Sequence, residues 1–119
     1  MPTYIMLSNL TDAGARTVSK KPKRIQEVNT ELEKAGVKVI AQYATLGPYD
    51  FVNVVEADSN ATIAKASVKL AARGSIRITT LAAVDIEEFI SSLAEEAQAA
   101  HSFSGPSAQA EQTLMRSVP

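Results

Sequence analysis

The sequence contains no cysteine and only one histidine. The lack of cysteine excludes disulfide bonds, thiol catalysis and thiolate metal sites. The one histidine, His101, follows the last predicted helix and has no carboxylates at ligand spacing. We therefore interpret His101 as a solvated residue, and we expect neither a metal site nor a cofactor.

The sequence also lacks a large excess of positive or negative charge and any long apolar run. The formal net charge is -1 and the pI is about 5.8, so no global field draws the chain to nucleic acid. A short basic run is read as the solvated start of a helix, offset by nearby glutamates, and comprises Lys20, Lys21, Lys23 and Arg24. No apolar run approaches the roughly 18 residues of a spanning helix, and no basic leader opens the chain. We expect a cytoplasmic protein that binds neither nucleic acid nor membrane.

Hydrophobic periodicity predicts one α+β domain in the 119 residues. Strands are expected at 3–10, 37–46, 51–57 and 75–84. After residue 11 we expect a short leading turn and then a main helix from near Pro22 to residue 34, and further helices are expected at 58–73 and at 85–97. This order is the ferredoxin-like βαββαβ pattern with an added C-terminal helix, an antiparallel sheet carrying its helices on one face. Residues 1–97 form the predicted domain and residues 98–119 a flexible tail.

Alternation along the strands predicts which side chains face the helices. We place four residues under the helices: Val52, Val54, Ile76 and Ile78. The opposite, open face would then carry Phe51, Asn53, Val55, Arg77, Thr79 and Leu81, joined by Tyr4, Met6 and Ser8. That face is too apolar for open water, so we expect a second copy of the chain to cover it, as a homodimer or a higher even oligomer.

Three segments resemble the GYD domain family when taken in order: Pro2-Thr3-Tyr4-Ile5, Gly47-Pro48-Tyr49-Asp50-Phe51-Val52 and Ile76-Arg77-Ile78-Thr79-Thr80-Leu81. The resemblance covers roughly residues 1–89. It implies a ferredoxin-like domain of the dimeric α/β-barrel type, found in small bacterial proteins with no agreed biochemical function. A weaker similarity links the same motifs to the ligand-binding domains of Lrp-type regulators, which dimerise and hold small effectors between subunits.

Six residues are candidates for binding a ligand. Gly47 and Pro48 form a tight turn that aims Tyr49 and Asp50, either at a ligand or at structural contacts, and we favour the structural interpretation. The others lie on the predicted open face and comprise Tyr43, Asn53, Arg77 and Thr79. The guanidinium group of Arg77 suits a small acidic ligand, but Arg77 can equally pair with Asp50 or with a glutamate across the dimer.

These features favour a small-molecule-binding or stress-related accessory protein that binds its ligand in a cavity between subunits. Two alternatives remain open. One is a cofactor-independent enzyme, monooxygenase- or isomerase-like, acting inside the barrel, and the other is a purely structural assembly module.

Overall fold

The computed structural model describes residues 1–102. The elements in chain order are β1 (Thr3–Leu10), α1 (Asp12–Lys20), α2 (Arg24–Lys34), β2 (Lys38–Ala44), β3 (Phe51–Glu56), α3 (Asn60–Ala71), β4 (Ile76–Ala83) and α4 (Ile86–Ser102). Residues 103–119, most of the predicted tail, lie outside the described residues, and so does the side chain of His101.

Local sequence explains where the helices begin. Thr11 accepts a hydrogen bond from the Gly14 nitrogen and so caps α1, and Ser59 caps α3 in the same way through the Thr62 nitrogen. The chain then breaks between Lys20 and Arg24, around Pro22, and restarts as α2. The predicted helix start near Pro22 is thereby confirmed, whereas the predicted leading turn is a helix of nine residues, α1.

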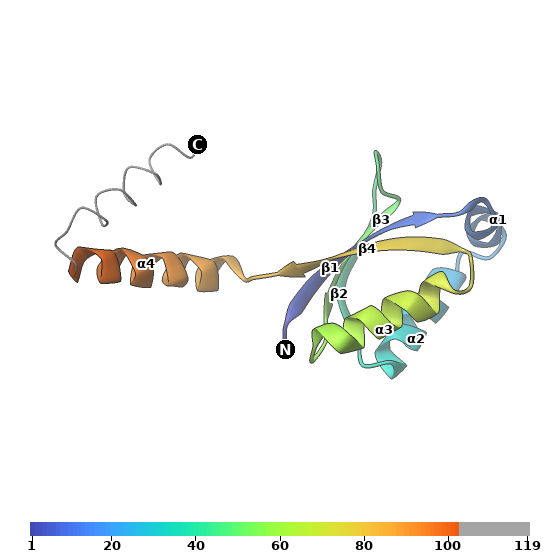
Figure 1. Ribbon diagram of the computed structural model, residues 1–119. Helices are drawn as coiled ribbons and strands as arrows, with labels where there is room; N and C mark the ends of the chain where they lie inside the picture. Colours follow the sequence, from blue (N-terminus) through green and yellow to red (C-terminus); the bar gives the residue numbers. More distant parts are fainter. Residues whose placement is uncertain (103–119) are drawn as a thin grey trace. The chain divides into compact units, whose positions relative to one another are not determined.

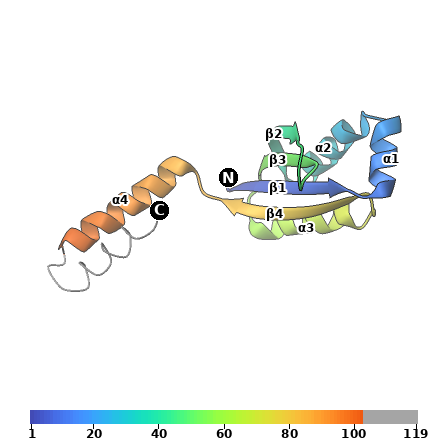
Figure 2. The ribbon, with the colours of Figure 1, turned by 90° about the horizontal axis from the view of Figure 1, so that it is seen from above.

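The four strands form one antiparallel sheet in the order β2-β3-β1-β4 (Figure 2). Helices α2 and α3 lie on the same side of this sheet (Figure 1). This arrangement confirms the predicted ferredoxin-like fold. A bulge between Val39 and Ala41 shifts the register of β2 against β3, and Ile40 is half exposed there.

The hydrophobic core fills the space between the sheet and the helices. From the sheet it takes Tyr4, Met6 and Val55, and the rest of the cluster comes from the helices and the residues next to them, comprising Leu32, Val37, Ala57, Ile63, Ala66 and Leu70. Tyr4 is buried, and its hydroxyl donates a 2.5 Å hydrogen bond to Asn60 Oδ1 at the start of α3. The tyrosine therefore packs its ring in the core and ties β1 to α3.

The predicted faces are correct for β4 and wrong for β1 and β3. Ile76 and Ile78 face the helices, and Arg77, Thr79 and Leu81 point away, as expected. Tyr4, Met6 and Ser8, by contrast, are buried on the helix side, where Asn53 and Val55 join them. Val52 and Val54 are consequently on the open face. Strand β3 is apolar at successive positions, so its sequence alone did not determine which side faced the core.

The described part of the C-terminal segment is helix α4, in a unit separate from residues 1–83. Asp85 caps it by accepting hydrogen bonds from the nitrogens of Glu87 and Glu88, at 3.1 and 3.4 Å. One stripe of α4 is apolar and half exposed, consisting of Ile86, Phe89, Ile90 and Leu93.

Candidate functional site

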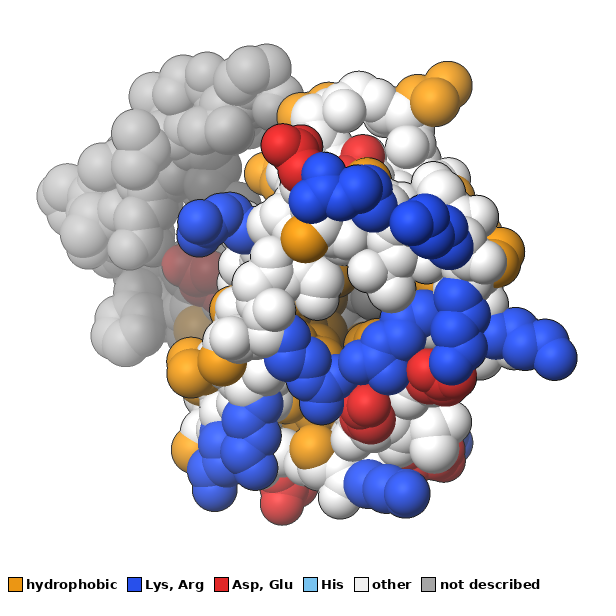
Figure 3. Space-filling model, turned by 90° about the vertical axis from the view of Figure 1, so that its right-hand side faces the viewer, with side chains coloured by type: hydrophobic (Ala, Val, Ile, Leu, Met, Phe, Trp, Pro, Cys, Tyr) orange, Lys and Arg blue, Asp and Glu red, His pale blue; other side chains and the backbone are white. Residues whose placement is uncertain are grey.

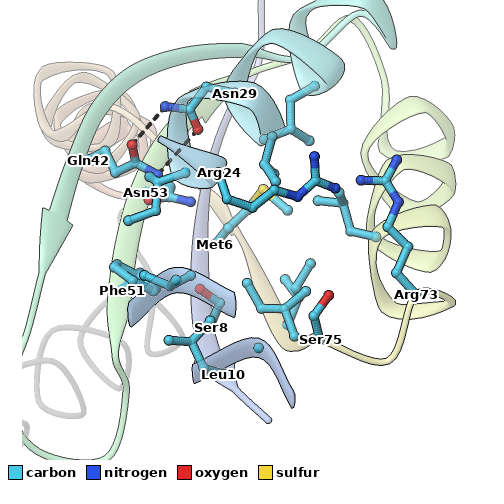
Figure 4. A pocket seen from close by; sticks show the side chains of 18 of the residues that line it. Met6, Ser8, Leu10, Arg24, Asn29, Gln42, Phe51, Asn53, Arg73 and Ser75 are labelled. Carbon is cyan, nitrogen blue, oxygen red and sulfur yellow. Dashed lines mark hydrogen bonds between the residues drawn. The ribbon is translucent and has the colours of Figure 1, made fainter. Parts of the chain in front are cut away.

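A cavity of about 90 Å³ lies within the unit of residues 1–83, between the helix side of the sheet and helices α1, α2 and α3 (Figure 4). Its floor comes from β1, β3 and β4 and includes Met6, Ser8, Phe51, Asn53 and Ile78. A single water needs a cavity of only about 10–15 Å³, so this cavity has room for several atoms beyond one water. We refer to this space as the helix-side cavity.

Two buried polar atoms in the floor have no hydrogen-bond partner among the described residues: Ser8 Oγ and Asn53 Oδ1. Ser8 is 2% exposed and Asn53 is 8% exposed. Met6 pairs with Asn53 and Ser8 pairs with Phe51, so Ser8 and Asn53 are diagonal neighbours on one face of adjacent strands. A buried polar group without a partner costs about 1–3 kcal/mol, which makes this pair a marked feature of the cavity.

A reciprocal amide pair forms one wall of the helix-side cavity. Asn29 Nδ2 on α2 donates to Gln42 Oε1 on β2 at 2.7 Å, and Gln42 Nε2 donates back to Asn29 Oδ1 at 3.3 Å. Figure 4 shows the two side chains beside Asn53. Because the two amides satisfy each other, they hold α2 against β2 and keep this wall polar.

Two arginines line the cavity on the side of α2 and α3, and Glu31 accepts hydrogen bonds from both. Arg24 Nη1 lies 3.1 Å from Glu27 Oε2 and 3.4 Å from Glu31 Oε1, and Arg73 donates to the other oxygen of Glu31. Glu27 is also held by Lys21 at 2.9 Å. We call these five residues the charged rim. It contains three cations, Lys21, Arg24 and Arg73, and two carboxylates, Glu27 and Glu31.

The ion pairs of the charged rim shift the ionisation of its members. The hydrogen bond from Arg73 lowers the pKa of Glu31, and the hydrogen bonds from Lys21 and Arg24 lower the pKa of Glu27. The hydrogen bond to Glu27 raises the pKa of Arg24, against a smaller opposing effect of burial. Both carboxylates are therefore ionised at neutral pH, and the rim keeps one excess positive charge.

The wider surface around the charged rim is also basic. Residues 1–83 carry eleven Lys and Arg against seven Asp and Glu. Figure 3 shows Lys and Arg side chains gathered across one face, around a hollow in which apolar atoms are visible. This part of the chain therefore attracts anions, although the net charge of the whole sequence is -1.

The Gly47-Pro48-Tyr49-Asp50 turn lies at the end of β1. Gly47 has φ of +104°, a left-handed conformation that glycine adopts without strain, in the turn that the sequence predicted. Asp50 Oδ2 accepts from the Leu10 nitrogen at 2.9 Å, and the Asp50 nitrogen donates to Ser8 O and Asn9 Oδ1. The carbonyl of Tyr49 accepts from Thr45 Oγ1 at 2.6 Å. These bonds fasten the turn to β1.

The six predicted site residues therefore lie in three places. Tyr49 and Asp50 are in the turn, Asn53 is in the helix-side cavity, and the remaining three, Tyr43, Arg77 and Thr79, are on the open face of the sheet. None of the ion pairs found within residues 1–102 includes Arg77. The predicted open-face cluster thus loses Asn53, which lies on the other side of the sheet.

Most of the helix-side cavity was not predictable from the sequence pattern. Ser8 was assigned to the wrong face, and no role was given to Asn29, Gln42 or Arg73. One signal was available, because Ser8 is a polar residue in phase with Tyr4 and Met6 on β1. Within the described residues there is no cluster of three potential metal ligands, and no helix is long and apolar enough to span a membrane.

Comparison with known proteins identifies the family. Residues 4–93 match the GYD domain. The chain is 58% identical over 94 residues to the glutamine synthetase and cystathionine beta-lyase binding protein of Thermus thermophilus, covering 78% of this chain and 99% of that protein. A crystal structure of another Thermus thermophilus chain aligns with a TM-score of 0.48 and 20% identity, covering 71% of this chain and 95% of the other. The chain belongs to the GYD domain family.

Proposed function

We propose that this protein is an accessory protein that binds a metabolic enzyme of the glutamine synthetase or cystathionine β-lyase type. The observation that carries the proposal is the 58% identity to a Thermus protein named for binding these two enzymes. The similarity extends over 99% of that relative, so the aligned region includes nearly all of the relative's surface. More than half of the aligned side chains are the same, which favours a shared class of partner.

We further propose that the protein works as a homodimer joined through the open face. Two apolar rows cross this face in register: Tyr43, Val52, Leu7 and Thr79 in one, and Ala41, Val54, Ile5 and Leu81 in the other. Tyr43 is 60% exposed and Leu81 is 46% exposed. A continuous apolar surface of this kind is typical of an interface, and tyrosine is enriched at such contacts.

Charge complementarity at the two ends of the open face favours a second copy of the chain as its partner. Arg77 lies opposite Asn9 at one end of β1, and Glu56 lies opposite Thr3 at the other end. Neither charged side chain takes part in an ion pair within residues 1–102. In a dimer of facing sheets whose two-fold axis lies perpendicular to β1, each Arg77 comes close to the partner's Glu56 end. Any ligand held between the two copies would contact Tyr43, Arg77 and Thr79.

The enzyme-binding proposal is tested by size-exclusion chromatography with light scattering. The full chain is mixed separately with glutamine synthetase, with cystathionine β-lyase and with an unrelated control enzyme, all from its own host. Co-elution with at least one of the first two, and not with the control, is expected. Separate elution of the chain from both enzymes would contradict the proposal.

A further inference from the structure

We propose that the helix-side cavity binds a small organic acid that carries a hydrogen-bond-donating amide or amine at the end opposite its carboxylate. This inference does not depend on enzyme binding or on dimerisation. It rests on three features of one chain: the unpartnered polar atoms of the floor, the apolar middle of the cavity and the excess positive charge of the rim.

The unpartnered polar atoms of the floor favour a ligand that donates a hydrogen bond. Asn53 Oδ1 can only accept a hydrogen bond, and Ser8 Oγ can either donate or accept. Both atoms are buried and both lack a partner within the described chain. Because they are diagonal neighbours on adjacent strands, one amide or ammonium group placed between them can donate to Asn53 and contact Ser8 at the same time. Buried polar groups are nearly always satisfied, so a ligand with donors is favoured over an apolar one.

The apolar lining of the helix-side cavity favours a ligand whose central part is short and apolar. Around the polar pair, the lining is apolar: Met6, Phe51 and Ile78 come from the floor and Val28 comes from α2. A volume of about 90 Å³ is less than the 150 Å³ of an engineered cavity that accepts benzene. The cavity therefore fits a chain of a few methylene groups, and it excludes a large aromatic ligand.

The excess positive charge of the charged rim favours a ligand with an anionic group. Arg24 and Arg73 line the cavity, and their side chains are 31% and 42% exposed, so each keeps part of its guanidinium group accessible. Glu31 is shared between them, and Glu27 is shared between Arg24 and Lys21. A ligand carboxylate at the rim would balance the remaining positive charge, and arginine presents donors in the paired geometry that a carboxylate accepts.

Three four-carbon probes separate these requirements. Succinamate has an amide at one end and a carboxylate at the other, butyrate lacks the amide, and butyramide lacks the carboxylate. Amide chemical shifts of the ¹⁵N-labelled full chain are followed as each probe is added. We expect succinamate to shift the signals of Ser8, Asn53 and the residues around Arg73, with an affinity at least about tenfold above that of either single-ended probe.

Matched variants assign each end of the probe. Asn53→Leu should remove the advantage of succinamate over butyrate, and Arg73→Gln should remove its advantage over butyramide. Lys65→Gln, which removes a positive charge from an exposed position on α3, should leave all three affinities unchanged. The dispersion of each variant's spectrum shows whether that variant is folded. If Asn53→Leu does not fold, Ser8→Ala provides a second variant of the floor.

Three results would overturn the proposal. One is equal affinity for the three probes, a second is a set of shifts confined to the open face, and the third is no saturable shift with succinamate.

Discussion

The Asp50 carboxylate accepts a hydrogen bond from the main-chain nitrogen of Leu10, the last residue of β1, at 2.9 Å. The two residues are 40 positions apart in the sequence, so this bond fixes the β2–β3 turn to the end of the central strand. The Asp50 nitrogen adds bonds to Ser8 O and Asn9 Oδ1. The aspartate of the family's motif is thus a structural clamp in this chain.

Replacing Asp50 tests this clamp. Asp50→Ala removes the acceptor and should lower the free energy of unfolding by about 1.5–3 kcal/mol, because hydrogen bonds to charged groups contribute about this much. Asp50→Asn keeps an acceptor oxygen and should lose less. Urea unfolding at pH 7 measures both. An Asp50→Ala variant as stable as the wild type would show that the bond contributes nothing.

Gly14 is predicted to tolerate no larger side chain. A Cβ atom on this residue would lie 1.9 Å from the Ser75 carbonyl oxygen, where α1 packs against the loop before β4. Gly14→Ala should therefore destabilise the fold by about 1–3 kcal/mol, although alanine is the better helix former. Ser19→Ala, on the exposed side of the same helix, serves as the control and should change stability by less than about 0.5 kcal/mol. Thermal unfolding that ranks the two variants equally would contradict the close approach.

The charged rim predicts a pH dependence of stability. The Arg73 hydrogen bond lowers the pKa of Glu31, so the stabilisation is complete above the unfolded-state pKa, near 4.5, and is lost as pH falls through the lower folded-state value. Glu31→Gln should therefore remove part of the decline in stability below about pH 5. Because Glu31 is partly exposed, solvent screening keeps the effect below about 1 kcal/mol. The exposed Glu33, changed to Gln, is the matched control. Identical pH profiles for wild type and Glu31→Gln would refute the prediction.

The proposed dimer is tested by exchanging the charges at the ends of the open face. Arg77→Glu and Glu56→Arg each place like charges together across the two-fold axis and should weaken dimerisation by about tenfold. The double variant restores opposite charges and should recover most of the affinity. Sedimentation equilibrium measures all three against the wild type. If the double variant dimerises no more tightly than the single variants, Arg77 and Glu56 do not meet across the interface. A monomeric wild type would refute the dimer itself.

The sequence predicted the order of elements because turn and cap residues mark each boundary. Thr11, Pro22, Ser59 and Asp85 all lie at helix starts or breaks in the structure. It also predicted the faces of β4, where apolar and polar residues alternate clearly.

The faces of β1 and β3 could not be predicted in the same way. Strand β3 contains Phe51, Val52, Val54 and Val55, so both of its sides are apolar, and choosing one side wrongly reversed the partner residues on β1. The helix-side cavity depended on that choice. Its rim also depends on the contact between Glu31 and Arg73, which are 42 residues apart and have no local pattern that links them.

The central claim, that this protein binds a metabolic enzyme, is tested most directly by sedimentation velocity with a fluorescently labelled chain. Mixed with purified glutamine synthetase or cystathionine β-lyase from its host, the 12.7 kDa chain should move into the fast boundary of at least one enzyme. An excess of unlabelled chain should return it to the slow boundary. A label that stays in the slow boundary at saturating concentrations of both enzymes would contradict the account.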